Sequence, residues 1–176
     1  MKPVQAPLTE FTDERGRLLF NNSLDLSAWK RLYFLENSEL ALSRGWHGHR
    51  TEEKCFIPVI GSFIVHTVCI DEESSELDKV VSFNMDAAAP TALFVPKMHA
   101  NKITAEGPSA RLLVLSSRNL EESLEDIVRY PLGQWARNPQ VWQEGLVRVQ
   151  FDYGSCSKAV RALRLIVWCW QPFEKH

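Results

Sequence analysis

Apolar residues occur along the chain in short runs separated by polar, turn-forming stretches. Residues 54–60 and 63–70 are two such runs joined by Gly61-Ser62, which predicts a β-hairpin. Pro58 cannot donate to a ladder of backbone hydrogen bonds and therefore predicts an edge or a bulge in its strand. Many short runs at a spacing of roughly ten residues, with hardly any helical periodicity, predict an all-β sandwich or barrel. Further strands are predicted over residues 18–20, 30–35, 44–49, 79–84, 92–96 and 110–117.

Two segments depart from the strand pattern. Residues 120–127 have their acidic side chains early, where a helix dipole favours them, and a short helix is predicted there. The pattern of apolar and polar residues changes near residue 138. Residues 157–170 would be apolar on nearly every face of a helix, and a C-terminal helix is predicted there. We therefore divide the chain into a domain of residues 1–137 and a C-terminal extension of residues 138–176.

Composition narrows the classes of function. The 176 residues are 45% hydrophobic and 24% charged, as in an ordinary globular protein with a full core. A net charge of -2 gives no electrostatic reason to expect nucleic acid or an anionic membrane as partner. No secretory signal or membrane-spanning segment is predicted, and the cysteines lack paired zinc or redox spacing. These features favour a cytoplasmic protein with reduced thiols. The cysteines are Cys55, Cys69, Cys156 and Cys169.

His47 and His49 are the first candidates for chemistry. Side chains alternate along a strand, so two histidines one residue apart face the same side. Lys54 follows just beyond a polar turn, and Arg31 and Tyr33 share one face of an earlier strand by the same alternation. These residues predict a site, with proton transfer by histidine as its leading use.

Two sets of motifs resemble those of the small cupin-type nucleotide-sugar isomerases and epimerases. One set is similar to the dTDP-4-keto-6-deoxyglucose 3,4-ketoisomerase group, and the other to the dTDP-4-dehydrorhamnose 3,5-epimerase group. The resemblance covers residues 3–135. The first set is Asp13-x-Arg15-Gly16-x-Leu18, Lys30-Arg31-x-Tyr33 and Arg44-Gly45-x-His47-x-His49, and the second is Arg44-Gly45-x-His47, Lys54, Phe94-Val95-Pro96 and Ala100-Asn101.

This resemblance implies an RmlC-like cupin jelly-roll β-barrel and a homodimer with exchanged N-terminal strands. It also implies an isomerase or epimerase for a dTDP-linked 4-keto-6-deoxyhexose, used in surface polysaccharide synthesis, which needs no metal or other cofactor. By position, His47 matches the epimerase general base and His49 the second histidine of the ketoisomerase pair. Lys54 matches the lysine that stabilises the enolate oxygen, and Tyr33 matches the pocket tyrosine. The expected substrate-binding residues are Arg31, Arg44 and Asn101.

The implied chemistry accounts for these residue types. Isomerisation or epimerisation begins when a base removes a proton from the carbon beside a ketone, and a neutral histidine suits this step. The resulting enolate oxygen needs a cation placed in advance, such as Lys54 or Arg31. A second histidine or a tyrosine returns the proton, while the barrel excludes bulk water and its mouth binds the nucleotide.

A sugar-binding cupin with reduced catalytic capacity is one alternative. Residues 112–117 contain no tyrosine, although the epimerases carry their second acid in that strand. The turn at Pro96-Lys97-Met98 also differs from the epimerase pattern, and Asn101 occupies the place of a later histidine. These departures weigh against a double epimerisation but leave a ketoisomerase or a single epimerase open.

A metal-dependent cupin is the other alternative. His47, His49 and Glu53 have the spacing by which many cupins bind a divalent ion through imidazole and carboxylate ligands. The fourth ligand would be a histidine at the position of Asn101, and His99 is expected in a loop, out of register with it. Acid–base chemistry by the two histidines is therefore the preferred interpretation.

Overall fold

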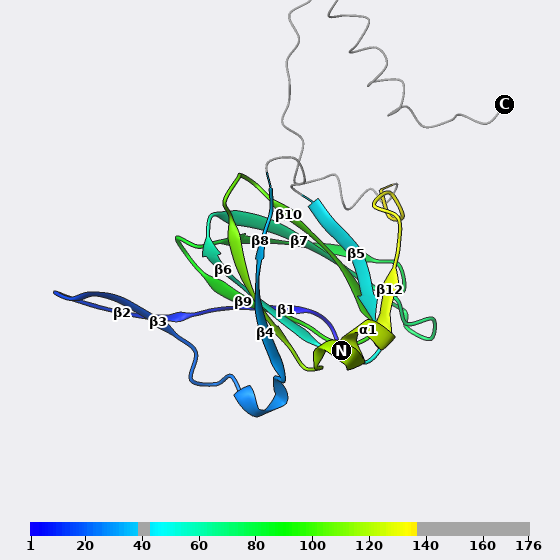
Figure 1. The fold of residues 1–176 in the computed structure, drawn as a ribbon, viewed down its shortest axis with the longest axis horizontal. Helices are drawn as coiled ribbons and strands as arrows, with labels where there is room; N and C mark the ends of the chain where they lie inside the picture. The colour runs from blue at the N-terminus through cyan, green and yellow to red at the C-terminus, as the bar shows by residue number, and fades with distance from the viewer. Residues whose placement is uncertain (39–42, 137–176) are drawn as a thin grey trace, which may run out of the picture. The chain divides into compact units, whose positions relative to one another are not determined.

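Two antiparallel five-stranded sheets form the body of the protein in the computed structural model, which describes residues 1–38 and 43–136 (Figure 1). The predicted all-β jelly roll is confirmed. The first sheet has the order β1 (Val4–Pro7), β9 (Thr91–Val95), β6 (Lys54–Ile60), β11 (Arg111–Ser116), β4 (Arg31–Glu36). The second has the order β12 (Ile127–Arg129), β5 (Ser43–His49), β10 (His99–Ala105), β7 (Ser62–Cys69), β8 (Val80–Asp86).

The main hydrophobic core lies between the two sheets. Alternate residues of each strand point inward, as the two-residue period of a strand requires. Phe56 and Leu112 from the first sheet meet Phe63 and Val65 from the second, and all four are fully or almost fully buried. The inward positions at one end of these same strands carry the polar residues of the site.

Aromatic side chains cover the outer face of the second sheet. Trp46 of β5 makes an edge-on contact with Trp135, their ring centroids 4.9 Å apart, and Tyr130 lies 4.9 Å from Trp135. Trp46 Nε1 donates a hydrogen bond to the carbonyl of Leu132. The side chain of Trp46 packs on this outer face. Because side chains alternate along a strand, those of its neighbours on β5 must point into the barrel interior.

A hairpin of β2 (Thr9–Asp13) and β3 (Gly16–Phe20) projects from the two sheets (Figure 1). In its turn, Asp13 accepts a hydrogen bond from the backbone N–H of Arg15, and Gly16 has φ +128°. The predicted helix is also confirmed as α1 (Leu120–Asp126), and a 3-10 helix, η1, spans Leu26–Ala28.

The strand containing Pro58 has the predicted bulge. Arg111 pairs with Ile60 while Leu112 pairs with Pro58, so Val59 is the extra residue. β6 pairs with β9 only over Lys54, Cys55 and Phe56, and the ladder to β9 has ended before the proline.

Other expectations were wrong or fall outside the described residues. The predicted hairpin of residues 54–60 and 63–70 does not form, because β6 belongs to the first sheet and β7 to the second. His99 begins strand β10 instead of lying in a loop, and β1, β2 and β12 were not predicted. Cys55 and Cys69 are buried and free, as expected. The helix over residues 157–170 and the domain boundary at 137–138 involve residues that the structure does not describe. In the described ranges, no helix is both long and apolar enough to cross a membrane.

Candidate active site

The two histidines of β5 face the barrel interior together. His47 lies directly opposite Asn101 of β10, and His49 lies opposite His99. His49 is 2% exposed, whereas His47 is half-buried. The predicted pairing of both side chains on one face is therefore confirmed.

The backbone geometry at position 45, two residues before His47, requires a glycine. Its φ is +128°, a conformation that side chains rarely adopt, and a Cβ atom there would lie 2.6 Å from the carbonyl oxygen of Asn101. The pairing of β5 with β10 shifts register at this point. Glycine thus permits the close approach that sets the position of His47 against β10.

Three predicted site residues come from the opposite sheet. In adjacent strands Lys54 pairs with Ser116, which pairs with Arg31. Lys54 is 8% exposed, and Tyr33 packs against the core cluster that includes Val114. The Arg31 guanidinium lies 5.1 Å from the centre of the Tyr33 ring. Lys54, Arg31 and Tyr33 therefore share the barrel interior with the two histidines.

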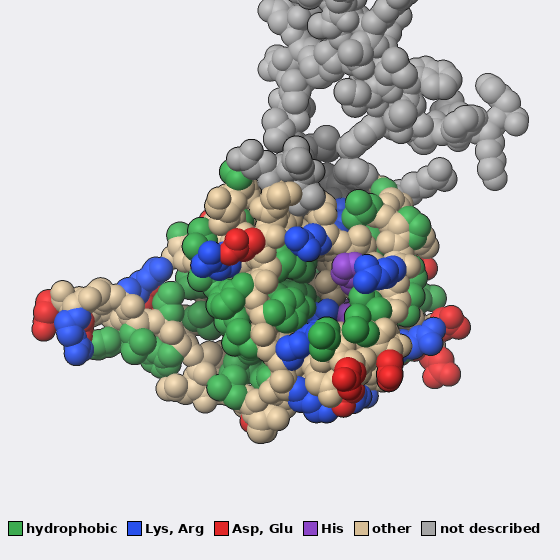
Figure 2. Space-filling model, viewed as in Figure 1, with side chains coloured by type: hydrophobic (Ala, Val, Ile, Leu, Met, Phe, Trp, Pro, Cys, Tyr) green, Lys and Arg blue, Asp and Glu red, His purple; other side chains and the backbone are tan. Residues whose placement is uncertain are grey.

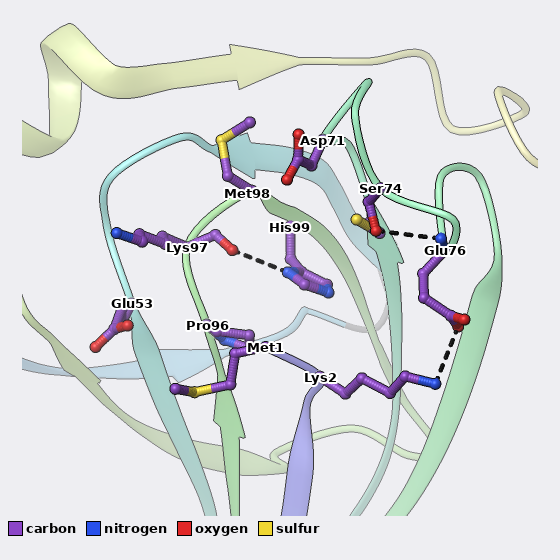
Figure 3. Close-up of a pocket in the computed structure, with 11 residues that line it drawn as sticks. Met1, Lys2, Glu53, Asp71, Ser74, Glu76, Pro96, Lys97, Met98 and His99 are labelled. Atoms are coloured by element: carbon purple, nitrogen blue, oxygen red, sulfur yellow. Dashed lines mark hydrogen bonds and ion pairs between the residues drawn. The ribbon is translucent and has the colours of Figure 1, made fainter.

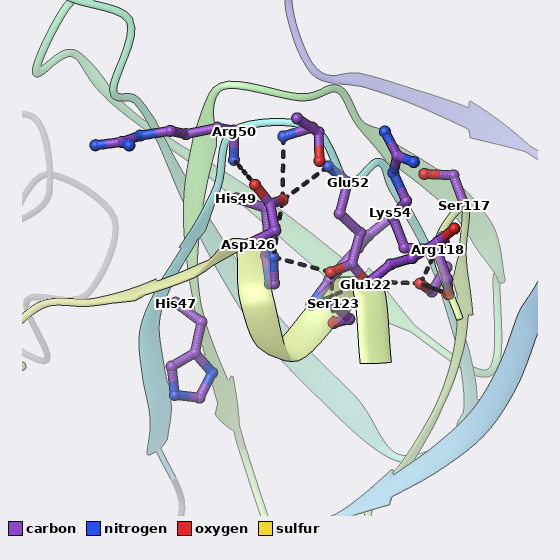
Figure 4. A network of polar contacts seen from close by, with 12 residues as sticks. His47, His49, Arg50, Glu52, Lys54, Ser117, Arg118, Glu122, Ser123 and Asp126 are labelled. Carbon is purple, nitrogen blue, oxygen red and sulfur yellow. Dashed lines mark hydrogen bonds and ion pairs between the residues drawn. The ribbon is translucent and has the colours of Figure 1, made fainter. Parts of the chain in front are cut away.

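Glu52 is the centre of the polar contacts at this end of the barrel (Figure 4). Its carboxylate is completely buried, although it belongs to the loop between β5 and β6. His49 Nδ1 lies 2.8 Å from Glu52 Oε2, and the Arg31 and Lys54 nitrogens lie 3.6 and 3.7 Å from Glu52 Oε1. We call these residues, with two serines that donate to the carboxylate, the Glu52 network. Its members are Glu52, His49, Arg31, Lys54, Ser116 (2.6 Å) and Ser123 (2.7 Å).

Electrostatics keep Glu52 ionised despite its burial. Burial alone would raise the pKa of Glu52, but the contacts with His49, Lys54 and the two serines outweigh it and lower the pKa to about 2. A buried carboxylate is stable only when its charge is compensated in this way. The interior therefore contains a fixed negative charge surrounded by donors.

Helix α1 closes the site from one end. Asn119 and Glu122 form a reciprocal capping box that defines its first turn. The helix supplies Ser123 to Glu52, and its last residue, Asp126, accepts hydrogen bonds from the backbone N–H groups of residues 50–52. Burial opposes ionisation of Asp126, but these hydrogen bonds prevail and its pKa is lowered. The loop conformation that buries Glu52 thus depends on α1.

His47 has a different environment. Burial lowers the pKa of His47, and the positive charges of Arg129, Lys54 and Arg44 lower it further. Arg129 of β12 lies directly opposite His47 in the sheet. Figure 2 shows histidine side chains recessed among basic ones on this side of the molecule. At neutral pH His47 is an uncharged imidazole, the form that a general base requires.

Lys54 and Tyr33 also have altered ionisation. Burial lowers the pKa of Lys54, although Glu52 opposes the shift. Burial and the nearby Glu52 charge raise the pKa of Tyr33 to about 12, against a weaker effect of Arg31. Tyr33 therefore keeps its proton near neutral pH and, in proton transfer, is available as an acid.

Arg44 and Asn101, the remaining predicted residues, contact the backbone. Arg44 is exposed and donates a hydrogen bond to the carbonyl of Glu36 at 3.2 Å. Asn101 is 5% exposed, and its amide donates to the carbonyl of His47 at 3.3 Å. Asn101 therefore supports the strand that carries His47, and its expected contact with substrate stays a prediction.

The structure does not bring together the expected metal ligands His47, His49 and Glu53. Among the described residues, the His, Cys, Asp and Glu side chains with ligand atoms within 4.8 Å of one another are His49, Glu52 and Asp126. Two cations and two hydroxyls already compensate Glu52, and three backbone N–H groups compensate Asp126. This donor set does not fit a divalent ion, because its oxygens are already committed.

A pocket of about 250 Å³ is lined by Glu53, which follows Glu52 in the chain, and by His99, which pairs with His49 (Figure 3). The Nδ1 of His99 lies 3.0 Å from the carbonyl oxygen of Lys97, and the Lys2–Glu76 ion pair (3.3 Å) forms part of the lining. His99 therefore opens into this pocket and does not join the Glu52 network. The lining residues are Met1, Lys2, Glu53, Cys69, Asp71, Ser74, Glu76, Pro96, Lys97, Met98 and His99.

Sequence comparison identifies the family. The family profile described as "FdtA: WxcM-like, C-terminal" matches residues 2–130, a span that includes the barrel, both site histidines and α1. The chain belongs to this family. No curated protein sequence matches the chain significantly.

Solved structures share the fold of this WxcM-like chain. The Mycobacterium tuberculosis rmlC epimerase has 17% identity and a TM-score of 0.67, with 74% of this chain and 70% of that chain covered. The Streptomyces bikiniensis 3'-monoepimerase ChmJ, in complex with dTDP-quinovose, has 16% identity and a TM-score of 0.69 over 85% and 79%. A Helicobacter canadensis 3,4-ketoisomerase has 22% identity and a TM-score of 0.60 over 74% and 92%. These similarities confirm the RmlC-like cupin fold.

Several residues of the site were not predicted from the sequence. The sequence signal for Glu52 was its position between His49 and Lys54. The neighbouring Glu53 was predicted as a metal ligand instead, because its spacing from the histidines fits a metal motif. Ser123, Asp126 and Arg129 come from the segment that closes the barrel. Nothing in their local sequence indicates that this segment reaches β5.

Proposed function

We propose that the protein is an isomerase or epimerase of a nucleotide-linked, dTDP-type 4-keto-6-deoxyhexose. The observation that carries the proposal is the convergence of His47, His49, Lys54, Arg31 and Tyr33 inside one barrel. Arg31 Nε and His49 Nε2 are buried without hydrogen-bond partners among the described residues. Buried donors and acceptors are normally satisfied, so these two atoms are suited to a polar ligand. The shared fold with sugar-nucleotide epimerases and ketoisomerases supports the same conclusion.

The reaction proceeds through an enolate. Neutral His47 takes the proton from the carbon beside the ketone, the C–H electron pair forms a carbon–carbon double bond, and the carbonyl pair moves to oxygen. Lys54 and Arg31 stabilise that oxyanion, because both are cations placed in a water-poor interior before the charge develops. In an epimerisation, Tyr33 returns a proton to the same carbon from the opposite face. In a ketone shift, the hydroxyl on that carbon also gives its proton to His49, and the two protons return to the neighbouring carbon and to the oxyanion.

The nucleotide is expected at the barrel mouth. Arg44 and Arg129 are exposed and flank His47, and neither has a carboxylate partner in the described part of the chain. Guanidinium groups bind phosphate oxygens in a bidentate manner, so these two arginines suit a diphosphate. Surface polysaccharide synthesis in the cytoplasm is the corresponding setting.

A homodimer belongs to the same proposal. The outer face of edge strand β4 exposes Leu32 and Phe34, each 57% accessible. The projecting β2–β3 hairpin exposes Phe11 and Leu18, which are 54% and 57% accessible. Large apolar side chains gathered on one edge and one projecting hairpin are typical of an interface, and a second copy offers the matching surface.

Deuterium exchange tests the enzymatic proposal. The protein is incubated in deuterated water with dTDP-4-keto-6-deoxyglucose, and NMR follows the hydrogen on the carbon beside the ketone. Exchange supports proton abstraction, and the product then distinguishes a ketone moved to the neighbouring carbon from an inverted centre. Binding without exchange would contradict the enzyme and support a sugar-binding cupin, which the absence of tyrosine from β11 favours.

A further inference from the structure

Glu52 carries its charge in a buried position, where an uncompensated charge costs free energy. Its side chain has no exposed surface, yet it belongs to a surface loop and could have pointed to solvent as Glu53 partly does. Replacing a whole buried ionic network by apolar side chains often costs little stability, because desolvation offsets the attraction between its charges. What this network does achieve is a defined arrangement of His49, Lys54 and Arg31 around one carboxylate.

We propose that Glu52 is a positioning residue, which acts through His49 and Lys54 without touching the substrate. Its Oε2 lies 2.8 Å from His49 Nδ1, and Oδ2 of Asp126 lies 3.5 Å from the same nitrogen, although neither contact is aligned with the ring N–H axis. Two carboxylates beside Nδ1 favour the tautomer with its proton there. Nε2, which has no partner among the described residues, is then the basic nitrogen that handles the substrate proton.

The other oxygen of Glu52 orients the cations. Oε1 is 3.7 Å from the Lys54 ammonium and 3.6 Å from the Arg31 guanidinium. Ser116 donates to Oε1 and Ser123 to Oε2, so β11 and α1 together fix the plane of the carboxylate. Glu52 therefore sets which nitrogen of His49 is basic and where the oxyanion-stabilising charges lie.

Kinetics of Glu52→Gln test this role, which rests on the proposed function. The substitution keeps the size of the side chain but removes its charge. We expect kcat to fall by about 10²-fold, with KM changed by less than about threefold, because the substrate does not contact Glu52. Glu125→Gln makes the same charge change on an exposed position of α1 and should leave both constants at wild-type values. A wild-type kcat in Glu52→Gln would overturn the proposal.

A double-mutant cycle separates positioning from a general structural effect. If Glu52 acts in part through His49, then Glu52→Gln added to His49→Gln should reduce the deuterium-exchange rate by a smaller factor than the same substitution does in the wild-type protein. An equal loss in both backgrounds would overturn the proposal. Ser123→Ala is the milder second variant, to be used if Glu52→Gln does not fold; it removes one hydroxyl from the carboxylate and should lower kcat by about tenfold.

The tautomer of His49 gives a readout that does not depend on activity. In ¹⁵N-labelled full-length protein, the ring nitrogens of His49 should show a proton on Nδ1 at neutral pH, and Glu52→Gln should reduce this preference. His49 signals that are identical in the two proteins would overturn the proposal. If the wild-type protein exchanges no substrate deuterium, the proposed function fails, while the NMR comparison still decides whether Glu52 fixes the imidazole.

Discussion

Arg129 lies directly opposite His47 where β12 pairs with the edge of β5. β12 is a strand of three residues at the edge of its sheet, and its pairing brings a guanidinium beside a half-buried imidazole. The Arg129 charge and burial both lower the pKa of His47. A base with a lowered pKa remains neutral, and hence active, below the pH at which an ordinary histidine becomes protonated.

Replacing Arg129 should therefore change the pH dependence of the reaction. In Arg129→Gln one positive charge near His47 is lost, so the pKa of His47 rises and the acid limb of the kcat/KM profile moves up by about half a pH unit. Nucleotide affinity should also fall. Profiles of kcat/KM against pH check this, with Arg50→Gln as a control, because the exposed Arg50 side chain points away from the site (Figure 4). An unchanged acid limb would show that His47 is not the titrating base.

The acid stability of the protein should depend on Glu52. The pKa of Glu52 is lowered to about 2 in the folded protein from 4.5, a difference that corresponds to about 3 kcal/mol. Because the folded-state pKa is the lower one, this stabilisation is complete above about pH 4.5 and is lost as the pH falls toward about 2. Glu52→Gln should lower the free energy of unfolding at pH 7 and flatten its fall in acid.

Urea unfolding measured at several pH values between about 7 and 3 provides the comparison. The variant Glu125→Gln serves again as the control, since its carboxylate is exposed on α1. Parallel pH dependences for Glu52→Gln and wild type would mean that Glu52 is not ionised in a compensated site.

The helix prediction succeeded because local signals dominate there, whereas the predicted hairpin at Gly61-Ser62 was wrong. The runs on either side of Gly61-Ser62 are both strands, but β6 pairs with β9 and β11 while β7 pairs with β8 and β10, so the chain passes from one sheet to the other here. Residues 120–127, in contrast, carry both a capping box and an early acidic turn. Strand β10 was missed for the opposite reason. Its inward positions include His99 and Asn101, so the site itself interrupts the apolar alternation that indicates a strand.

Some residues of the candidate site could likewise be predicted from the sequence, and others could not. His47 and His49 could be placed on one face because two residues on one strand obey a fixed period. Glu52 and Glu53 could not be distinguished, because they lie in a loop whose conformation is fixed by Asp126, 74 residues later. Contacts of that separation depend on the fold and not on local pattern.

Lys54 should contribute to the transition state more than to substrate binding. Removing its ammonium in Lys54→Gln takes away a buried cation near the expected oxyanion, and kcat should fall by about 10²–10³-fold. Steady-state kinetics and deuterium exchange measure the loss. Lys79→Gln, on an exposed lysine paired with Glu76, should retain wild-type rates. A rise in KM at unchanged kcat would instead make Lys54 a binding residue.

The proposed dimer should depend on the exposed face of β4. Replacing both Leu32 and Phe34 by serine removes two large apolar side chains, each 57% exposed, and should convert the dimer to monomer at micromolar concentration. Analytical ultracentrifugation provides the mass. Leu124→Ser alters an equally exposed leucine on α1, at 59%, and should leave the dimer intact. A wild-type protein that is monomeric throughout would reject the interface.

Gly45 should be necessary for both stability and catalysis. In Gly45→Ala the new Cβ would meet the Asn101 carbonyl at 2.6 Å and Lys102 Cα at 2.8 Å, and the φ of +128° disfavours any side chain. The backbone of β5 must therefore move away from β10, at a cost of about 1–3 kcal/mol in the free energy of unfolding. His47 is two residues away on the displaced strand, so kcat should fall together with stability. Urea unfolding and exchange kinetics measure both effects.

Gly107→Ala is the matched control, because a Cβ there meets no atom within 4 Å, and it should behave as wild type in both measurements. A stable and fully active Gly45→Ala would show that the close approach of β5 to β10 does not position the base.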